Sequence, residues 1–401
     1  MKLILKIFLI ITLSFCAEYY SSLYGSGEKI ITSNPSNISL GWSNLFSSNN
    51  HLNTDNLSNF FMSESVRLSV STNFNFSTIN NKNYYKQKLN YFGFLVPIKE
   101  NKLAVGVSIS PYYRINSNII ENDYSYFAGN INESPLAYKS EYFYNGGPSV
   151  AEFLFSSKIN DKLSFGISFE YIFGSLYTYV KHNIYNINYN IDEEISYTDN
   201  SLDQFTSIKN FNGYGIKLET SYIKSKNNFI GSINILNNNE ITEYFYDDIA
   251  PGALEIGGIT YNNENTFEFS SPLELNLGYS RYFKNGSIIF EYYTYKPFES
   301  EKNILNNPDL SKNKINFGYH GNVVDTEMTF GTGLYYIDSY NENIKSKKFG
   351  LTFGMGFNMI RNITLDATLD LGKNSIEISE QLDENYINLY LGISSSDKWF
   401  K

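Results

Sequence analysis

Alternation of apolar and polar residues, over segments of about ten residues, constrains this chain more than any other feature of its sequence. In residues 363–372, Leu365, Ala367 and Leu369 alternate with small or acidic residues such as Thr364 and Asp366. Successive side chains on a β-strand point to opposite faces, so such a segment has one apolar and one polar face. The pattern predicts strands that belong either to a soluble β-sandwich or to a membrane barrel.

Repetition of this pattern predicts about fourteen strands, a number that suits an outer-membrane barrel. The connections between them alternate between tight turns, such as residues 97–102 and 158–162, and long segments, such as residues 112–147 and 176–212. Short turns on one side and long loops on the other are typical of transmembrane barrels, and a soluble sandwich has no reason to sort its loops this way. We therefore predict an all-β fold, a closed antiparallel transmembrane β-barrel. The strands are expected to begin near Val66, Lys88, Leu103, Val150, Leu163, Gly213, Phe229, Leu273, Ser287, Lys314, Glu327, Phe349, Ile363 and Tyr386.

The two faces of the expected strands differ in chemistry. Rows such as Leu103, Val105 and Val107 carry no Asp, Glu or Lys and suit lipid. The opposite rows consist mainly of Gly, Ser, Thr and Asn, with scattered charges. Such charges either line a conduction path or pair with one another and hold a plug, and their mixed signs favour the second role. The expected inward charges are Arg67, Glu170, Lys217, Glu219, Glu274, Asp366 and Asp370.

The N-terminal residues predict secretion and an internal plug. Residues 1–16 have the basic start and short apolar core of a signal peptide, which points to the outer membrane of a Gram-negative-type bacterium. Residues 17–65 lack the two-residue period that marks the barrel of residues 66–401. A barrel of about fourteen strands is too wide for its own side chains to fill, so we expect residues 17–65 to form an N-terminal lumen plug.

Several local motifs occur in an order that resembles the FadL-type (FadL/TodX) outer-membrane transporters, most closely their divergent Bacteroidetes-like branch. Asn34 and Pro35, followed by Gly41 and Trp42, look like part of the family's plug, and residues 91–94, 163–173 and 397–400 look like its strands and tail. The resemblance implies uptake of hydrophobic molecules such as long-chain fatty acids. It further implies plug rearrangement and lateral release through a kinked third strand.

Pro111 lies in the expected third strand and is the candidate for that lateral gate. Proline cannot donate a hydrogen bond to a neighbouring strand, so it is tolerated only at edges, bulges or gaps. The alternative is a strand that simply ends at the outer rim.

Aromatic residues in the long connections have two interpretations. They form either an apolar cargo pocket under the loops or a belt at the membrane interface, where amphipathic rings lie at headgroup level. The candidates are Tyr142, Phe143, Tyr144, Tyr244 and Tyr246.

Other functions are poorly supported by the sequence. The three histidines lie in no recognisable catalytic motif, so we expect no enzyme, and we expect neither a cofactor nor a metal site. The net charge of −10 argues against nucleic acid. The expected partners of a monomer are outer-membrane lipid, a hydrophobic cargo and the barrel-assembly machinery. Two alternatives to the transporter remain, a barrel that docks or shuttles secreted proteins and a general diffusion porin.

Overall fold

The computed structural model describes residues 28–29, 32, 34–46, 56–79, 82–120, 125–127, 136–189, 195–247, 263–269, 273–296, 311–323, 326, 328–340, 345–360, 362–377 and 381–397. The expected signal peptide, residues 1–16, lies outside them. Among the described residues, no helix is long and apolar enough to cross a membrane.

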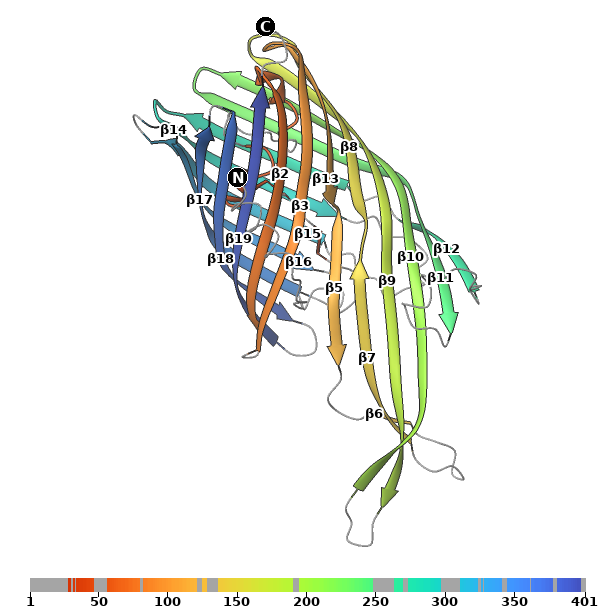
Figure 1. Ribbon diagram of the computed structural model, residues 1–401. Helices are drawn as coiled ribbons and strands as arrows, with labels where there is room; N and C mark the ends of the chain where they lie inside the picture. Colours follow the sequence, from red (N-terminus) through yellow and green to blue (C-terminus); the bar gives the residue numbers. More distant parts are fainter. Residues whose placement is uncertain are drawn as a thin grey trace.

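Strands make up nearly all of the described chain (Figure 1). They are β1 (Glu28–Lys29), β2 (Val66–Ile79), β3 (Lys82–Lys99), β4 (Leu103–Pro111), β5 (Tyr113–Ile120), β6 (Ser125–Phe127), β7 (Leu136–Gly146), β8 (Ser149–Lys158), β9 (Leu163–Tyr189), β10 (Ile195–Lys224), β11 (Asn227–Asp247), β12 (Asn263–Phe269), β13 (Leu273–Tyr282), β14 (Gly286–Lys296), β15 (Ser311–Asn322), β16 (Met328–Tyr340), β17 (Lys345–Ile360), β18 (Ile363–Glu377) and β19 (Gln381–Asp397). Two short helices, α2 (Pro35–Ile38) and η2 (Phe60–Met62), precede β2.

The wall is a closed ring of 14 antiparallel strands, as the sequence predicted. The order around it is β2, β3, β4, β8, β9, β10, β11 and then β13 to β19. The last strand pairs with the first, with Tyr386 opposite Ser77 and Ile393 opposite Val70. Closure pairs every strand of the ring with two neighbours, which is the condition for placing a sheet in hydrocarbon.

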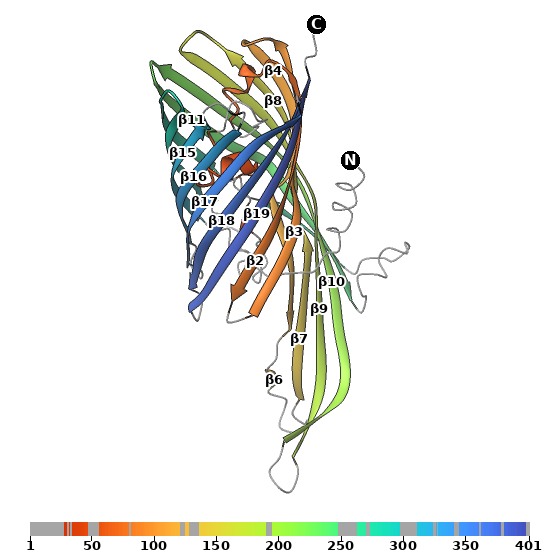
Figure 2. The ribbon, with the colours of Figure 1, turned by 60° about the vertical axis from the view of Figure 1, so that its left-hand side comes forward.

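One side of the barrel extends far beyond the other strands, at the end opposite the tight turns (Figures 1 and 2). β9 has 27 residues and β10 has 30, whereas β14 has 11. Much of the sequence expected to form long loops, residues 112–147 and 176–212, is therefore strand, and that part of the prediction was wrong. Beyond a bilayer both faces of a sheet can meet water, so the apolar alternation that reveals a strand is lost there.

The outer face is apolar and the inner face polar along the strands that form the ring. Phe349 is 56% exposed and Leu334 is 52% exposed, although both are large apolar side chains. Between such residues, inward side chains such as Thr352, Asp370 and Asn388 are buried. An exposed apolar exterior around a polar interior is the arrangement of a transmembrane barrel and indicates an outer-membrane protein.

The ladder between the second and third wall strands ends early. β4 pairs with β3 only as far as Ile109 opposite Phe92, although β3 begins ten residues before Phe92, at Lys82. β5, which continues β4 after Tyr112, pairs with β7 on one edge and with β1 on the other. In the described part of the chain no pairing joins β5 to β3, and Figure 1 shows the two strands apart.

Candidate functional site in the barrel interior

Residues 34–46 lie against the inner face of the wall, where α2 contacts β17, β18 and β19. Asn34 caps α2, because its side-chain oxygen accepts from the backbone N–H of Ser36 at 3.0 Å, and Pro35 suits the first helical position. Thr368 Oγ1 donates to the Pro35 carbonyl at 2.7 Å, and Thr352 Oγ1 donates to the Ser39 carbonyl at 2.9 Å. The wall thus satisfies carbonyl groups at this short helix.

Glycines on the inner face make room for this segment. A Cβ atom built on Gly318 would lie 2.7 Å from the Leu40 carbonyl oxygen, and one on Gly278 would lie 2.6 Å from the Phe46 ring. A Cβ atom built on Gly333 would likewise lie too close to Gly41, and one on Gly354 would lie too close to Ser39. The inner wall therefore has a shallow track without side chains, and the backbone of residues 39–41 occupies it.

A sharp turn at Gly41 and Trp42 directs the tryptophan towards the wall. Both residues have positive φ angles, 76° and 62°, and the second is unusual for a residue with a large side chain. Trp42 Nε1 donates to Asp370 Oδ2 at 3.2 Å, and Lys348 Nζ lies 5.2 Å from the centroid of the indole ring. Tyr390 packs edge-on against the ring at 5.9 Å. These contacts hold the strained turn in place.

A fully buried ion pair binds the next three residues. Glu291 on β14 and Lys314 on β15 are 3.1 Å apart, and both side chains have no exposed surface. The Glu291 carboxylate also accepts from Ser43 Oγ at 2.7 Å and from the backbone N–H groups of Asn44 and Leu45 at 3.0 and 3.2 Å. Buried charges persist when they are paired and hydrogen-bonded, and both conditions hold here.

Residues 56–63 contact a different part of the wall. Ser58 donates from its backbone N–H and its hydroxyl to Glu219 on β10, at 2.8 and 2.7 Å. Leu57 and Phe61 are buried with Leu95, Ala104 and Leu154 from β3, β4 and β8. The two segments thus contact separate arcs of the inner wall. Residues 17–27 and 47–55 lie outside the described residues, so the plug as a whole domain stays a prediction.

An apolar patch lies on the inner face beside the shortened β3–β4 ladder. Tyr112, Val150 and Ile172 are buried together, and Phe211 packs against them. Leu176 and Val180 continue along the same face of β9 and are also buried. A separate apolar cluster joins Leu40, Leu45 and Phe46 to Ile230 and Ile289 of the wall, so the patch at Tyr112 is distinct from the surface that residues 34–46 contact.

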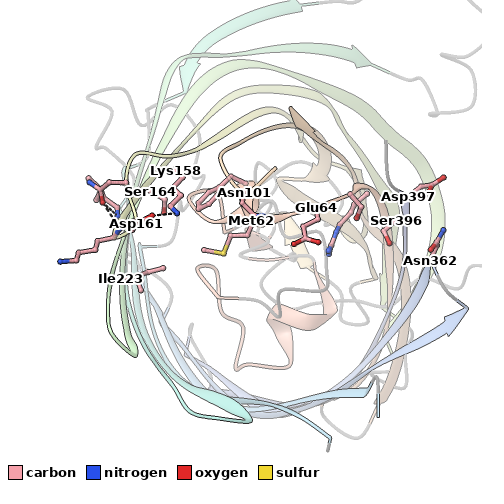
Figure 3. A pocket seen from close by; sticks show the side chains of 16 residues that line it. Met62, Glu64, Asn101, Lys158, Asp161, Ser164, Ile223, Asn362, Ser396 and Asp397 are labelled. Carbon is pink, nitrogen blue, oxygen red and sulfur yellow. Dashed lines mark hydrogen bonds and ion pairs between the residues drawn. The ribbon is translucent and has the colours of Figure 1, made fainter. Parts of the chain in front are cut away.

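A cavity of about 1130 Å³ opens at the end of the barrel that carries the tight turns. Figure 3 shows Met62 near the middle of the ring of strands, with Lys158 and Asp161 on one side and Asn362, Ser396 and Asp397 on the other. Its walls are mixed in polarity and its charges have both signs, so the cavity offers no single ligand chemistry.

The seven charges expected to face inward are spread over the interior. Asp370 and Glu219 bind the two inner segments as described above, and Asp366 lines a small cavity with Ser36 and Ser39. The other four lie elsewhere on the inner wall: Arg67 lines the 1130 Å³ cavity, Glu170 accepts from Asn234 at 3.0 Å, Glu274 accepts from Tyr293 at 3.2 Å, and Lys217 is half-buried on β10.

Sequence reasoning missed Glu291 and Lys314, the ion pair that binds residues 42–45. Glu291 lies in a stretch whose two faces are both apolar or aromatic, so alternation gives no indication of its direction. Lys314 offered a better signal, since it alternates with Ile315 and shares its face with Asn316 and Gly318.

The five aromatic pocket candidates do not form one cluster. All lie on strands rather than in loops, and neighbours on a strand face opposite ways. Through their cross-strand partners, Tyr142 and Tyr144 share the face of Val180 and the barrel interior, whereas Phe143, Tyr244 and Tyr246 lie on the other face. A single pocket built from all five was a wrong expectation.

The remaining candidates are placed as follows. Pro111 is the last residue of β4, at the point where the ladder to β3 has ended, and the N–H of the next residue, Tyr112, donates to the carbonyl of Pro148.

His182 lies 3.0 Å from Ser140 Oγ and between two tyrosine rings, but Ser140 is fully buried and offers no accessible nucleophile. Within the described residues no group of acidic, His or Cys side chains could hold a metal ion.

Fold and interior together define a 14-stranded transmembrane β-barrel whose inner wall contacts residues 34–46 and 56–63. The chain belongs to the BamG family, whose model matches residues 1–401. Among curated proteins none matches the sequence. The expected Bacteroidetes-like branch stays a prediction.

Solved structures share the fold at low identity. A FadL homologue from Pseudomonas aeruginosa has 14% identity and a TM-score of 0.58, over 93% of this chain and 100% of that one. The CymD monoaromatic hydrocarbon channel has 12% identity and a TM-score of 0.54, over 92% and 98%. The P. putida toluene transporter TodX has 10% identity and a TM-score of 0.51, over 94% and 99%. The barrel is therefore of the FadL type in its architecture.

Proposed function

We propose that this protein is an outer-membrane channel for hydrophobic small molecules such as long-chain fatty acids. The observation that carries the proposal is the division of the interior. Residues 34–46 and 56–63 pack in two buried clusters with the wall, whereas the apolar cluster of Tyr112, Val150 and Ile172 beside the interrupted β3–β4 ladder includes none of these inner residues. Ligand sites for apolar molecules are concave and mostly apolar, which suits this patch.

The route follows from the same geometry. Cargo enters from the end with the long strands, contacts the apolar patch, and leaves sideways where β5 and β3 are not paired. Pro111 supports this role, because it has no N–H to extend the ladder towards β3. Rearrangement of the inner segments admits the cargo, and the protein needs no catalytic group, cofactor or metal ion. Fold relatives described as hydrocarbon channels and a toluene transporter support the class of cargo.

An uptake assay in liposomes tests the proposal. Ile172→Asp places a charge in the apolar patch and is expected to lower the uptake of a labelled long-chain fatty acid about tenfold or more, because an unpaired charge is costly in an apolar site. Ser168→Asp is the matched control, since it lies on the same face of β9 beside the half-buried cation Lys217. Equal uptake by both variants, or free passage of small sugars through the intact protein, contradicts the proposal.

A second candidate is a barrel that docks or shuttles secreted proteins. The long β9–β10 hairpin favours it, because a sheet that extends beyond the membrane offers a large surface for another protein (Figure 2). The same liposomes discriminate between the two functions, since a docking protein takes up no fatty acid. A general diffusion porin is disfavoured, because Glu291 and Glu219 bind chain segments inside the lumen.

A further inference from the structure

Basic side chains gather on neighbouring tight turns at one end of the barrel. The β3–β4 turn carries Lys99 and Lys102 with the acidic Glu100 between them, and the β8–β9 turn carries Lys158 and Lys162. These turns are in contact, because the backbone N–H of Lys158 donates to the carbonyl of Lys102 at 2.8 Å. Asp161 is the acidic residue of the second turn, and it pairs with Lys158 at 2.7 Å. The Lys158 ammonium lowers the pKa of the Asp161 carboxyl below its usual value.

Exposed basic side chains also lie on the next two tight turns around the ring. Lys224 and Lys226 stand in the β10–β11 turn, and Arg281 and Lys284 flank the β13–β14 turn. A backbone hydrogen bond of 2.8 Å from Tyr282 to Lys226 joins them. All four basic side chains are exposed. The turns therefore form a continuous basic arc, which we define as the cations at positions 99, 102, 158, 162, 224, 226, 281 and 284.

The arc has a sign opposite to that of the protein as a whole, whose formal net charge is −10. Elsewhere on this rim, the described residues carry Glu64 and Asp397 and no exposed cation. The arc thus covers the side of the ring that holds the β3–β4, β8–β9, β10–β11 and β13–β14 turns. A one-sided concentration of positive charge attracts an anionic partner, and the attraction is strongest at low salt.

Exposed apolar side chains accompany the cations. Ile98 is 53% exposed beside Lys99, and Ile159 is 61% exposed beside Lys158. Phe283 is 47% exposed beside Lys284, and the Arg281 guanidinium lies 6.0 Å from the centre of its ring. At the membrane surface the acyl chains of a phospholipid end where its phosphate begins. An apolar side chain at the end of a lipid-facing row, with a cation next to it, can contact both parts of the lipid. An acidic soluble protein would not require these apolar neighbours.

We propose that the basic arc binds the headgroups of anionic phospholipids in the leaflet that faces the tight turns. The phosphate and the negative headgroup contact the lysines and Arg281, and the acyl chains contact the apolar side chains beside them. Because the arc follows the turns from β3–β4 to β13–β14, anionic lipid collects next to these strands rather than all round the barrel. This binding does not depend on what the barrel transports.

The test uses the full chain in lipid nanodiscs made from the anionic lipid POPG and the zwitterionic lipid POPC. After mild extraction, native mass spectrometry counts the molecules of each lipid that remain bound. We expect the native protein to retain POPG in excess of its share of the mixture, and the excess to shrink as salt is added. Arg281→Gln combined with Lys284→Gln should reduce the excess at least about threefold.

The matched control removes the same charge at the opposite end of the barrel. Lys345 and Lys347 are exposed on β17, and changing both to Gln should leave the excess of POPG unaltered. Heat-dependent migration in gels verifies that each barrel is folded. Equal retention of POPG and POPC, or equal loss in the two double variants, overturns the proposal. Binding of soluble polyglutamate without any preference for POPG would assign the arc to an acidic protein instead, and overturns it as well.

Discussion

Replacement of Glu291 by Ala should release residues 43–45 from the wall. The change removes the acceptor of two backbone N–H groups and leaves Lys314 as a fully buried cation without its carboxylate. Breaking a buried pair in this way costs about 3–5 kcal/mol. Lys314 keeps contacts to the Trp42 carbonyl and to Asn44, so we expect the lower end of that range, about 3 kcal/mol.

That free energy should appear directly as hydrogen exchange. About 3 kcal/mol corresponds to roughly a hundredfold change in an equilibrium constant, since 1.4 kcal/mol is tenfold. The amides of Asn44 and Leu45 donate to Glu291, so their protection should fall by a similar factor. Mass spectrometry of the peptide that covers residues 38–46, from protein in detergent micelles, measures the change.

The control for this experiment is Glu384→Ala. Glu384 is also a buried inward carboxylate, but it accepts from Asn374 within the wall. Its loss should leave the exchange of Asn44 and Leu45 unchanged. If Glu291→Ala keeps full protection of these amides in a folded barrel, the buried pair does not hold the segment and the reasoning is wrong.

Two further substitutions test the inner track and the outer face. Gly318→Val should displace Leu40 and speed exchange over residues 38–41, because a Cβ at this position would lie 2.7 Å from the Leu40 carbonyl oxygen; unchanged exchange would show that the track is not tight. Leu334→Arg should lower the free energy of unfolding in lipid by about 2–4 kcal/mol, whereas Tyr222→Arg, near the rim, should lower it by about 0–1 kcal/mol. Equal losses would mean that the two positions lie at the same depth.

The 14-stranded ring was predictable from the sequence because lipid and lumen impose opposite chemistry on the two faces of each strand. Leu351 and Thr352 illustrate this, since one is exposed and the other fully buried. Beyond the bilayer this contrast is lost, which is why the strand character of residues 176–212 escaped detection. The tight turn at residues 158–162 was predicted, and the structure has it between β8 and β9.

The interior was only partly predictable. Inward direction could be assigned to Asp370 and Glu219 from alternation, but not which part of the N-terminal chain each would bind. Those partners depend on the closure of the ring, which brings strands from both ends of the sequence together. The five aromatic candidates do not share one face for a simpler reason, because Tyr142 and Phe143 are consecutive on a strand and must face opposite ways.

Residues 35–46 precede every strand of the ring, yet their contacts are among the most distant in the chain. Pro35 and Thr368 are separated by 333 positions, and Trp42 and Asp370 by 328. The surface that receives this segment comes from strands as late as β17 and β18, so it does not exist until the barrel is nearly complete. Contacts of such long range form late and slowly. Leu40, Leu45 and Phe46 therefore stay uncovered through most of assembly. Residues 35–46 are synthesised before the strands of the barrel but dock onto the inner wall after those strands have paired.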